Sequence, residues 1–158
     1  MMPSVGMVGN NGREMARAFL RMSQGAVSCY HITEKQPNGP DVNVLVAAEA
    51  APVLVNLIPR LSPQDYLVIN ADDTAIFPYL SDSAARLITY GFNSKACITA
   101  SSVTDEGLQV CIQRAFLGMD GQPRTPQEFS ASLGRGETST LAQSVLGAAA
   151  AWAIIEPV

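Results

Sequence analysis

Residues 9–14, Gly-Asn-Asn-Gly-Arg-Glu, lie between a short apolar run, Val5–Val8, and a helix-forming stretch that begins at Arg13. Phosphate-binding loops occupy this kind of turn, because loop N–H groups and the N-terminus of the following helix attract anions. Such a loop usually also carries a lysine that contacts the β- and γ-phosphates and a Ser or Thr that holds Mg²⁺. Arg13 and Glu14 stand in those two places. The candidate phosphate-binding residues are therefore Gly9, Asn10, Asn11, Gly12 and Arg13.

Three interpretations of this loop are open: a working phosphate site, an altered or relic anion site, and a plain turn between strand and helix. Arg13 keeps a positive charge, but on a planar group that is larger than a lysine ammonium. Glu14 suits the positive end of the helix dipole, yet it repels a phosphate from the same space. A loop that supports hydrolysis is the least favoured of the three.

A second polar cluster, Asn70-Ala71-Asp72-Asp73, follows the apolar run Tyr66–Ile69. The carboxyl ends of parallel strands are where open α/β sheets bind ligands, so Asn70, Asp72 and Asp73 are candidate binding residues. The alternative is structural: Asp73 or Thr74 caps the next helix and Asn70 forms a turn.

The elements that would position these residues form an α/β fold with three layers and a mainly parallel sheet. Short, continuous, β-branched apolar runs predict buried parallel strands. We place them at Val5–Val8, Ala26–Ile32, Val42–Ala47, Tyr66–Ile69 and Arg86–Tyr90. The helices between them are predicted at Arg13–Met22, Pro52–Leu61 and Ala75–Leu80, the last kept short by Pro78.

After Gly91 the pattern predicts a small antiparallel addition. Two strands, Ala96–Val103 and Leu108–Arg114, are joined by the turn 104–107, and a third strand is predicted in residues 126–133 after a turn at 119–124. A closing helix is predicted from Thr138 to Ile154. We expect one domain over residues 1–158, with the parallel part at 1–91, antiparallel strands at 92–133 and the closing helix at 134–158.

Composition excludes several classes of protein. A formal net charge of -4 and a pI of about 4.8 argue against nucleic acid or an anionic membrane as partner. The longest apolar run, Val145 to Ile155, has eleven residues and is too short to cross a bilayer. The N-terminus lacks the features of a signal peptide, so we expect a cytoplasmic location. The three cysteines, Cys29, Cys97 and Cys111, form no disulfide or zinc pattern and are expected to be buried thiols.

Taken in order, these stretches resemble the central ATP-binding domain of the Mur ligase family, whose relatives include folylpolyglutamate and cyanophycin synthetases. The family loop G-T-N-G-K-T-[TS] aligns with residues 9–15 without a gap, and Asn-Ala-Asp-Asp is intact at 70–73. The resemblance implies that Asn70–Asp73 lie by the nucleotide base and that Glu49, at the end of "DVNVLVAAE", helps to hold Mg²⁺. "TYG" at 89–91 and residues 134–141 match later family motifs.

The departures from the family pattern imply a degenerate ATP site. The loop lysine and threonine are Arg13 and Glu14, and the closing motif has lost its histidine and both asparagines, at Gly136, Glu137 and Thr140. The twenty residues between Glu49 and Asn70 leave no room for the family's second metal-binding histidine and carbamylated lysine. The single histidine, His31, is expected to be packed rather than to bind metal. The family's N- and C-terminal domains are also expected to be missing.

Three functions follow from this resemblance. The first is a Mur-ligase-like domain that is not a ligase by itself and acts through a protein partner or self-association, related to peptidoglycan synthesis. The second is an ATP- or nucleotide-binding module, and the third is a subunit of an ATP-dependent acid–amino-acid ligase. ATP and Mg²⁺ are cofactors only by resemblance, and their binding is expected to be weak.

Overall fold

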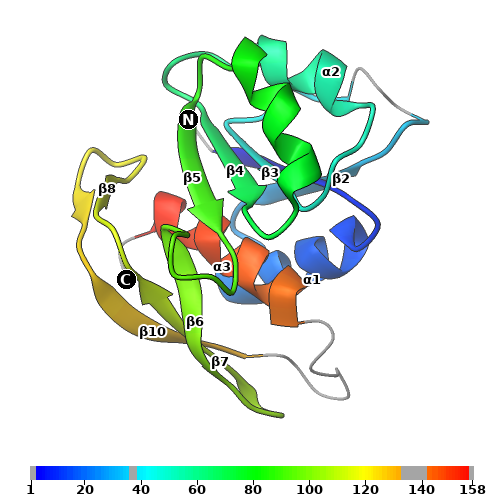
Figure 1. Ribbon diagram of the computed structural model, residues 1–158. Helices are drawn as coiled ribbons and strands as arrows, with labels where there is room; N and C mark the ends of the chain where they lie inside the picture. The colour runs from blue at the N-terminus through cyan, green and yellow to red at the C-terminus, as the bar shows by residue number, and fades with distance from the viewer. Residues whose placement is uncertain (1–2, 36–38, 133–141, 157–158) are drawn as a thin grey trace.

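The computed structural model describes residues 3–35, 39–132 and 142–156, which form a three-layer α/β fold (Figure 1). Its centre is an eight-stranded sheet with the order β10-β7-β6-β5-β4-β3-β1-β2. The strands of this sheet are β1 Ser4–Val8, β2 Ser28–Ile32, β3 Val44–Ala47, β4 Tyr66–Asn70, β5 Arg86–Tyr90, β6 Ile98–Val103, β7 Gly107–Ile112 and β10 Gln127–Ser132. The predicted fold class is confirmed.

The strands from β2 to β6 are parallel, and β7 and β10 add to the sheet in antiparallel fashion. In the parallel part, β1, β3 and β4 are buried along almost their whole length, because helical layers cover both faces of the sheet. The predicted turn at 119–124 joins two short strands, β8 Phe116–Leu117 and β9 Pro123–Arg124, which form a separate hairpin.

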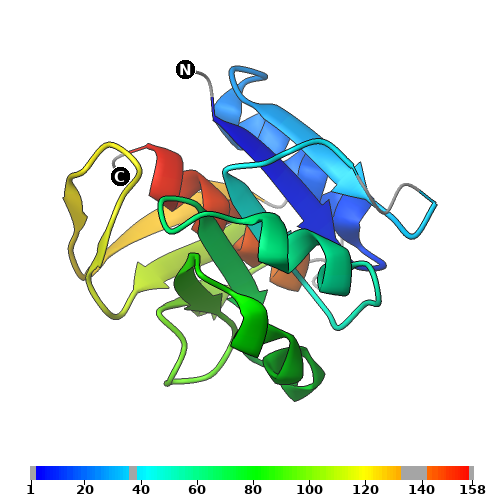
Figure 2. The same cartoon turned by 90° about the horizontal axis from the view of Figure 1, so that it is seen from above.

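Two long helices, α1 Gly12–Ser23 and α3 Ala142–Ile155, cover one face of the sheet (Figure 1 and Figure 2). The other face is covered by α2 Leu54–Leu57 and the 3₁₀ segments η1 Ile58–Arg60 and η2 Thr74–Asp82. Each layer has its own apolar core. None of the helices in the described ranges has the length and hydrophobicity of a membrane span.

Prolines explain where the helices differ from the prediction. The helix expected over 52–61 is a single α turn followed by η1, because Pro59 lacks the N–H that an α-helix needs. Pro78 likewise lies within η2, which is 3₁₀ throughout. The predicted start of the closing helix at Thr138, and the motif at 134–141, lie outside the described residues. The cysteines expected to be buried are half-buried.

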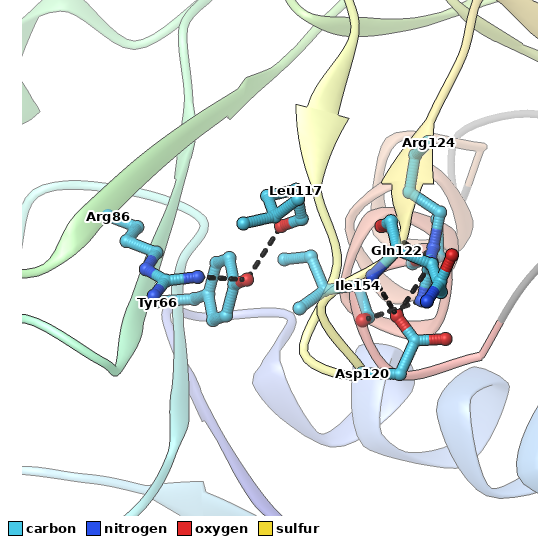
Figure 3. Close-up of polar contacts among 8 residues, drawn as sticks. Tyr66, Arg86, Leu117, Asp120, Gln122, Arg124 and Ile154 are labelled. Carbon is cyan, nitrogen blue, oxygen red and sulfur yellow. Dashed lines mark hydrogen bonds and ion pairs between the residues drawn. The ribbon is translucent and has the colours of Figure 1, made fainter.

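A buried arginine holds the β8–β9 hairpin against the end of α3 (Figure 3). Arg124, 1% exposed, donates through Nε to the Ala153 carbonyl at 2.6 Å and through Nη2 to the Ile154 carbonyl at 3.2 Å. Its Nη1 contacts Asp120 at 2.9 Å. The Gln122 N–H and the Arg124 guanidinium lower the pKa of Asp120. Since the last carbonyls of a helix have no partner within it, Arg124 serves as the cap of α3.

Candidate functional site

The carboxyl ends of β1, β3 and β4 bring most of the predicted site residues to one edge of the sheet. A polar cavity of about 70 Å³ at this edge is lined by Asn10, Asn11, Glu49, Asn70, Tyr90 and Gln143, among others. A neighbouring cavity of about 230 Å³ also includes Asn10 and Glu49, together with Gly9 and His31. The loop, Glu49 and Asn70 therefore meet, although they are far apart in the sequence.

The loop after β1 is a tight turn whose N–H groups are partly bound within the protein. Gly9 has φ +138°, and a Cβ atom there would lie 3.1 Å from the Cβ of Ala48, so the position requires glycine. Gly12 N donates to the Gly9 carbonyl at 3.0 Å. Asn11 precedes α1 without a capping bond from its side chain. Arg13, in the lysine position, is exposed.

Glu49 accepts a hydrogen bond from the main-chain N–H of Asn10. In a phosphate-binding loop, N–H groups of this kind face the anion. Here the N–H of Asn10 donates instead to a carboxylate of the chain itself. Glu14, half-buried in the first turn of α1, adds a second negative charge near the start of the helix.

His31 lies beside the same loop, and the prediction that it is packed in the core is wrong. The residue is exposed at the carboxyl end of β2, with Nε2 3.4 Å from the Gly9 carbonyl oxygen. A Cβ atom on Gly12 would come within 2.3 Å of His31 Cδ2, so glycine at position 12 allows the ring to lie there. Sequence periodicity missed this position because it does not show which side of an edge strand is left uncovered.

Asn70 and Asp73 make the local contacts that a structural role requires. Asn70 is 5% exposed; its Nδ2 donates to the Ala48 carbonyl at 3.0 Å and its Oδ1 accepts from Asp72 N at 3.0 Å. Asp73 caps η2 by accepting from Ala75 N, and it also accepts from Ala50 N, both at 3.1 Å. These bonds tie the end of β3 to the end of β4.

Asp72 extends this network to β5 and α3. Its carboxylate accepts from Phe92 N at 2.8 Å, from Asn93 Nδ2 at 2.7 Å and from Gln143 Nε2 at 3.2 Å. Gly91 lets Asp72 approach, because a Cβ atom there would lie 2.8 Å from Asp72 Oδ1. The carboxylate of Asp72 is thus engaged by three donors of the chain itself.

Tyr90 lines the smaller cavity and was not identified from the sequence as a site residue. Its side chain is fully buried, and its hydroxyl has no hydrogen-bond partner among the described residues. Burial raises its pKa well above the usual range, and the negative charges of Asp72 and Glu49 raise the pKa further. The signals for Tyr90 are its place at the end of the apolar run that forms β5 and its position within the "TYG" motif at 89–91.

Two features of these residues bear on the binding of a Mg²⁺–nucleotide complex. Position 14 supplies a carboxylate where a metal-binding hydroxyl would be needed, and Glu49 already accepts from Asn10. Within residues 3–35, 39–132 and 142–156, no three His, Cys, Asp or Glu side chains group as metal ligands. The arrangement can accept hydrogen bonds from donors through Glu49, and it can attract an anion through the exposed Arg13.

Several solved structures with a similar fold belong to ligases that are longer than this chain. A UDP-N-acetylmuramoyl-L-alanyl-D-glutamate–2,6-diaminopimelate ligase matches with a TM-score of 0.63 and 11% identity over 96% of this chain and 43% of that chain. A murein peptide ligase from Psychrobacter arcticus matches with a TM-score of 0.64 and 8% identity, over 97% and 44%. FolC from E. coli, solved with DHPP and ADP, has a TM-score of 0.56 and 9% identity, over 99% and 55%.

This likeness shows the fold: the chain has the architecture of a part of the Mur ligases and of FolC. It spans about half or less of the length of these neighbours. No model of a protein family matches the sequence, and no curated protein matches it.

Proposed function

We propose that this chain is a Mur-ligase-like domain with a degenerate ATP site, which has no ligase activity of its own and acts through self-association or a protein partner. The observation that carries the proposal is the hydrogen bond from Asn10 N to the Glu49 carboxylate. A phosphate that approached the loop would have to displace this carboxylate, since both groups are anions that need the same donor.

The charges at the start of α1 support the same conclusion. Phosphoryl transfer depends on positioning and on cationic stabilisation of the transferred group. Arg13 supplies one cation, but Glu14 follows it directly and is half-buried. Two carboxylates, Glu14 and Glu49, therefore oppose one guanidinium around the loop.

The outer edge of β2 supports self-association. Only β1 pairs with β2 among the described residues, so the opposite edge of β2 presents main-chain N–H and C=O groups that lack a strand partner. Exposed edge strands usually carry a lysine, a proline or another charge that blocks pairing. The β2 sequence, Ser-Cys-Tyr-His-Ile, has none of these, and Tyr30 is 40% exposed. A second copy adding its own β2 in antiparallel orientation fits this edge.

A role related to peptidoglycan synthesis is supported by the kinds of ligase that share the fold, which include a murein peptide ligase. In this proposal the domain contributes an interaction surface, and any amide-forming chemistry belongs to another chain.

A second candidate function is a nucleotide-binding module that works without Mg²⁺. The exposed Arg13, two residues after Asn11 of the smaller cavity, favours it. So does the fact that a MurF ligase from Thermotoga maritima, with a TM-score of 0.54, was solved with ADP.

Calorimetric titration of the purified chain with ATP, with and without Mg²⁺, separates the two functions. The degenerate-site proposal expects no Mg²⁺-dependent binding and no turnover of ATP. Saturable binding of ATP that is equally strong without Mg²⁺ would favour the nucleotide module. Tight binding of Mg-ATP, roughly micromolar (about 8 kcal/mol), or hydrolysis above background would overturn the main proposal.

A further inference from the structure

A cavity of about 550 Å³ lies at the opposite end of the sheet, where β4 and β5 begin. It is larger than the two cavities at the carboxyl edge, of about 230 and 70 Å³. Cavities of several hundred Å³ that combine apolar walls with a few polar groups are typical of small-molecule sites. The lining of this cavity is mixed: the apolar residues are Pro3 and Met119, and the polar ones are Asn43, Ser62, Gln64, Asp65, Tyr66 and Arg86.

Arg86 is an exposed residue, and its guanidinium is held in place without an acidic partner among the described residues. Its Nη1 donates to the Tyr66 hydroxyl at 3.0 Å, and its Nε lies 3.4 Å from the Pro63 carbonyl oxygen. Its central carbon is 5.4 Å from the centre of the Tyr66 ring, which adds a cation–π contact. No carboxylate pairs with Arg86 within the described ranges.

Tyr66 is in turn fixed by the hairpin. Its side chain is 1% exposed, and its hydroxyl donates to the Leu117 carbonyl at 2.6 Å (Figure 3). Two successive hydrogen bonds, from Arg86 to the Tyr66 hydroxyl and from that hydroxyl to the Leu117 carbonyl of β8, thus orient the guanidinium before any ligand binds. Because Arg has five N–H groups in a planar fork, Nη2 and the second hydrogen of Nη1 remain available to both oxygens of a carboxylate.

One negative charge in the lining limits the kind of anion. Asp65 accepts from Ser62 N at 2.8 Å through Oδ2 and remains part of the same wall. Asp65 offsets the attraction of any anion to Arg86, so little net Coulomb energy remains to compensate the loss of water around the ligand. That loss costs more for a phosphate dianion than for a carboxylate with one charge. The walls formed by Pro3 and Met119 favour an apolar substituent.

We propose that this cavity binds a small organic monocarboxylate, whose carboxylate pairs with Arg86 and whose apolar part packs against Pro3 and Met119. The site is separate from the loop at the carboxyl edge and does not depend on the function proposed for that edge.

An NMR titration of the ¹⁵N-labelled chain with benzoate tests the proposal, with benzamide as the uncharged analogue and inorganic phosphate as the dianion. We expect saturable shifts of the amides of Ser62, Gln64, Tyr66 and Met119 with benzoate. Benzamide and phosphate are expected to bind at least about tenfold more weakly, which corresponds to about 1.4 kcal/mol.

Arg86→Gln should weaken benzoate binding by a similar factor, and Asp65→Asn should strengthen it and admit phosphate. Arg60→Gln is the matched control, because Arg60 already pairs with Asp41 and does not line this cavity. If Arg86→Gln does not fold, the wild-type comparison of benzoate with benzamide and the Asp65→Asn variant decide the question. Equal binding of benzoate and benzamide, unchanged binding in Arg86→Gln, or shifts confined to residues 9–12 would overturn the proposal.

Discussion

The hydroxyl of Tyr90 on β5 lies directly against Gly147 of α3, where a Cβ atom would come within 2.9 Å of the oxygen. The sheet and α3 therefore meet closely at this point, and only glycine leaves room for the phenol. The same contact leaves the Tyr90 hydroxyl buried without a hydrogen-bond partner among the described residues. An unpaired buried hydroxyl destabilises a protein, so packing alone does not explain why residue 90 is a tyrosine and not a phenylalanine.

Tyr90→Phe should increase the free energy of unfolding by about 1 kcal/mol, because it removes a buried polar group that gains no bond on folding. Urea denaturation measures the change. Tyr30→Phe, which alters an exposed tyrosine, is the control and should have no effect. A loss of stability in Tyr90→Phe would show that the hydroxyl has a partner in solution.

Tyr90→Phe should also change how the free energy of unfolding depends on pH in the alkaline range. Folding raises the pKa of Tyr90 above its ordinary value of 10.0, so the folded state holds this proton more tightly than the unfolded state. This contribution to stability is complete below pH 10.0 and is lost as the pH rises above that value. Wild-type protein should lose stability between pH 10 and 11 more steeply than Tyr90→Phe does, as measured by denaturation at a series of pH values.

Glu49→Ala should increase the affinity for pyrophosphate without Mg²⁺ by about tenfold. The substitution frees the N–H of Asn10 and removes one of the two carboxylates near the loop. Calorimetry measures the affinity, and Glu106→Ala, which removes an exposed carboxylate in the β6–β7 turn, should leave it unchanged. If Glu49→Ala binds no better than wild type, the Glu49 carboxylate is not what excludes anions.

Arg13→Lys combined with Glu14→Thr should increase the affinity for ATP but not restore ligation. At about 4 Å, repulsion between a carboxylate and a phosphate is worth up to about 4 kcal/mol at a surface-like dielectric, and the double change removes it. Arg17→Lys, one turn further along α1, is the control. Formation of ADP above background by the double variant would contradict the expectation that other parts of the catalytic machinery are absent.

Arg124→Met should destabilise the protein by about 1–3 kcal/mol, since it leaves the Ala153 carbonyl near the end of α3 without a donor. The Ile154 carbonyl keeps the N–H of Met119, which donates to it at 2.8 Å. Arg60→Met is the matched control: Arg60 pairs with Asp41, whose side chain is 91% exposed, and loss of such a pair costs about 0–1 kcal/mol. Chemical denaturation of both variants gives the comparison. Similar losses in the two variants would mean that Arg124 does not support the end of α3.

Tyr30→Lys should reduce self-association, because a lysine on an edge strand disfavours the pairing of a second strand. Light scattering over a series of concentrations measures the oligomeric state. Val103→Lys changes another exposed apolar residue, on β6, and should not alter it. If wild-type protein is a monomer at every concentration, self-association through β2 is wrong and a different protein must be the partner.

The fold and the loop could be predicted because their signals are local. Continuous apolar runs located β1 to β5, five of the six parallel strands, and Gly9 and Gly12 marked the turn between β1 and α1. The sixth, β6, was expected in the antiparallel addition but pairs with β5 in parallel. The motif at Asn70–Asp73 was also visible, and both structural contacts considered for it, a cap by Asp73 and a turn at Asn70, are present. The roles of His31, Tyr90 and Gln143 were not visible, because each depends on a neighbour from a distant strand or helix.

The sequence by itself determined which segments are strands and that an acidic residue lies in the first turn of α1, since hydrophobic pattern and residue type are properties of short stretches. Only the tertiary structure decided that Glu49 reaches Asn10, that His31 lies over Gly12, and that Arg86 lines a cavity. These contacts join residues that are far apart in the chain. They follow from the order of strands in the sheet, which residue-by-residue patterns do not encode.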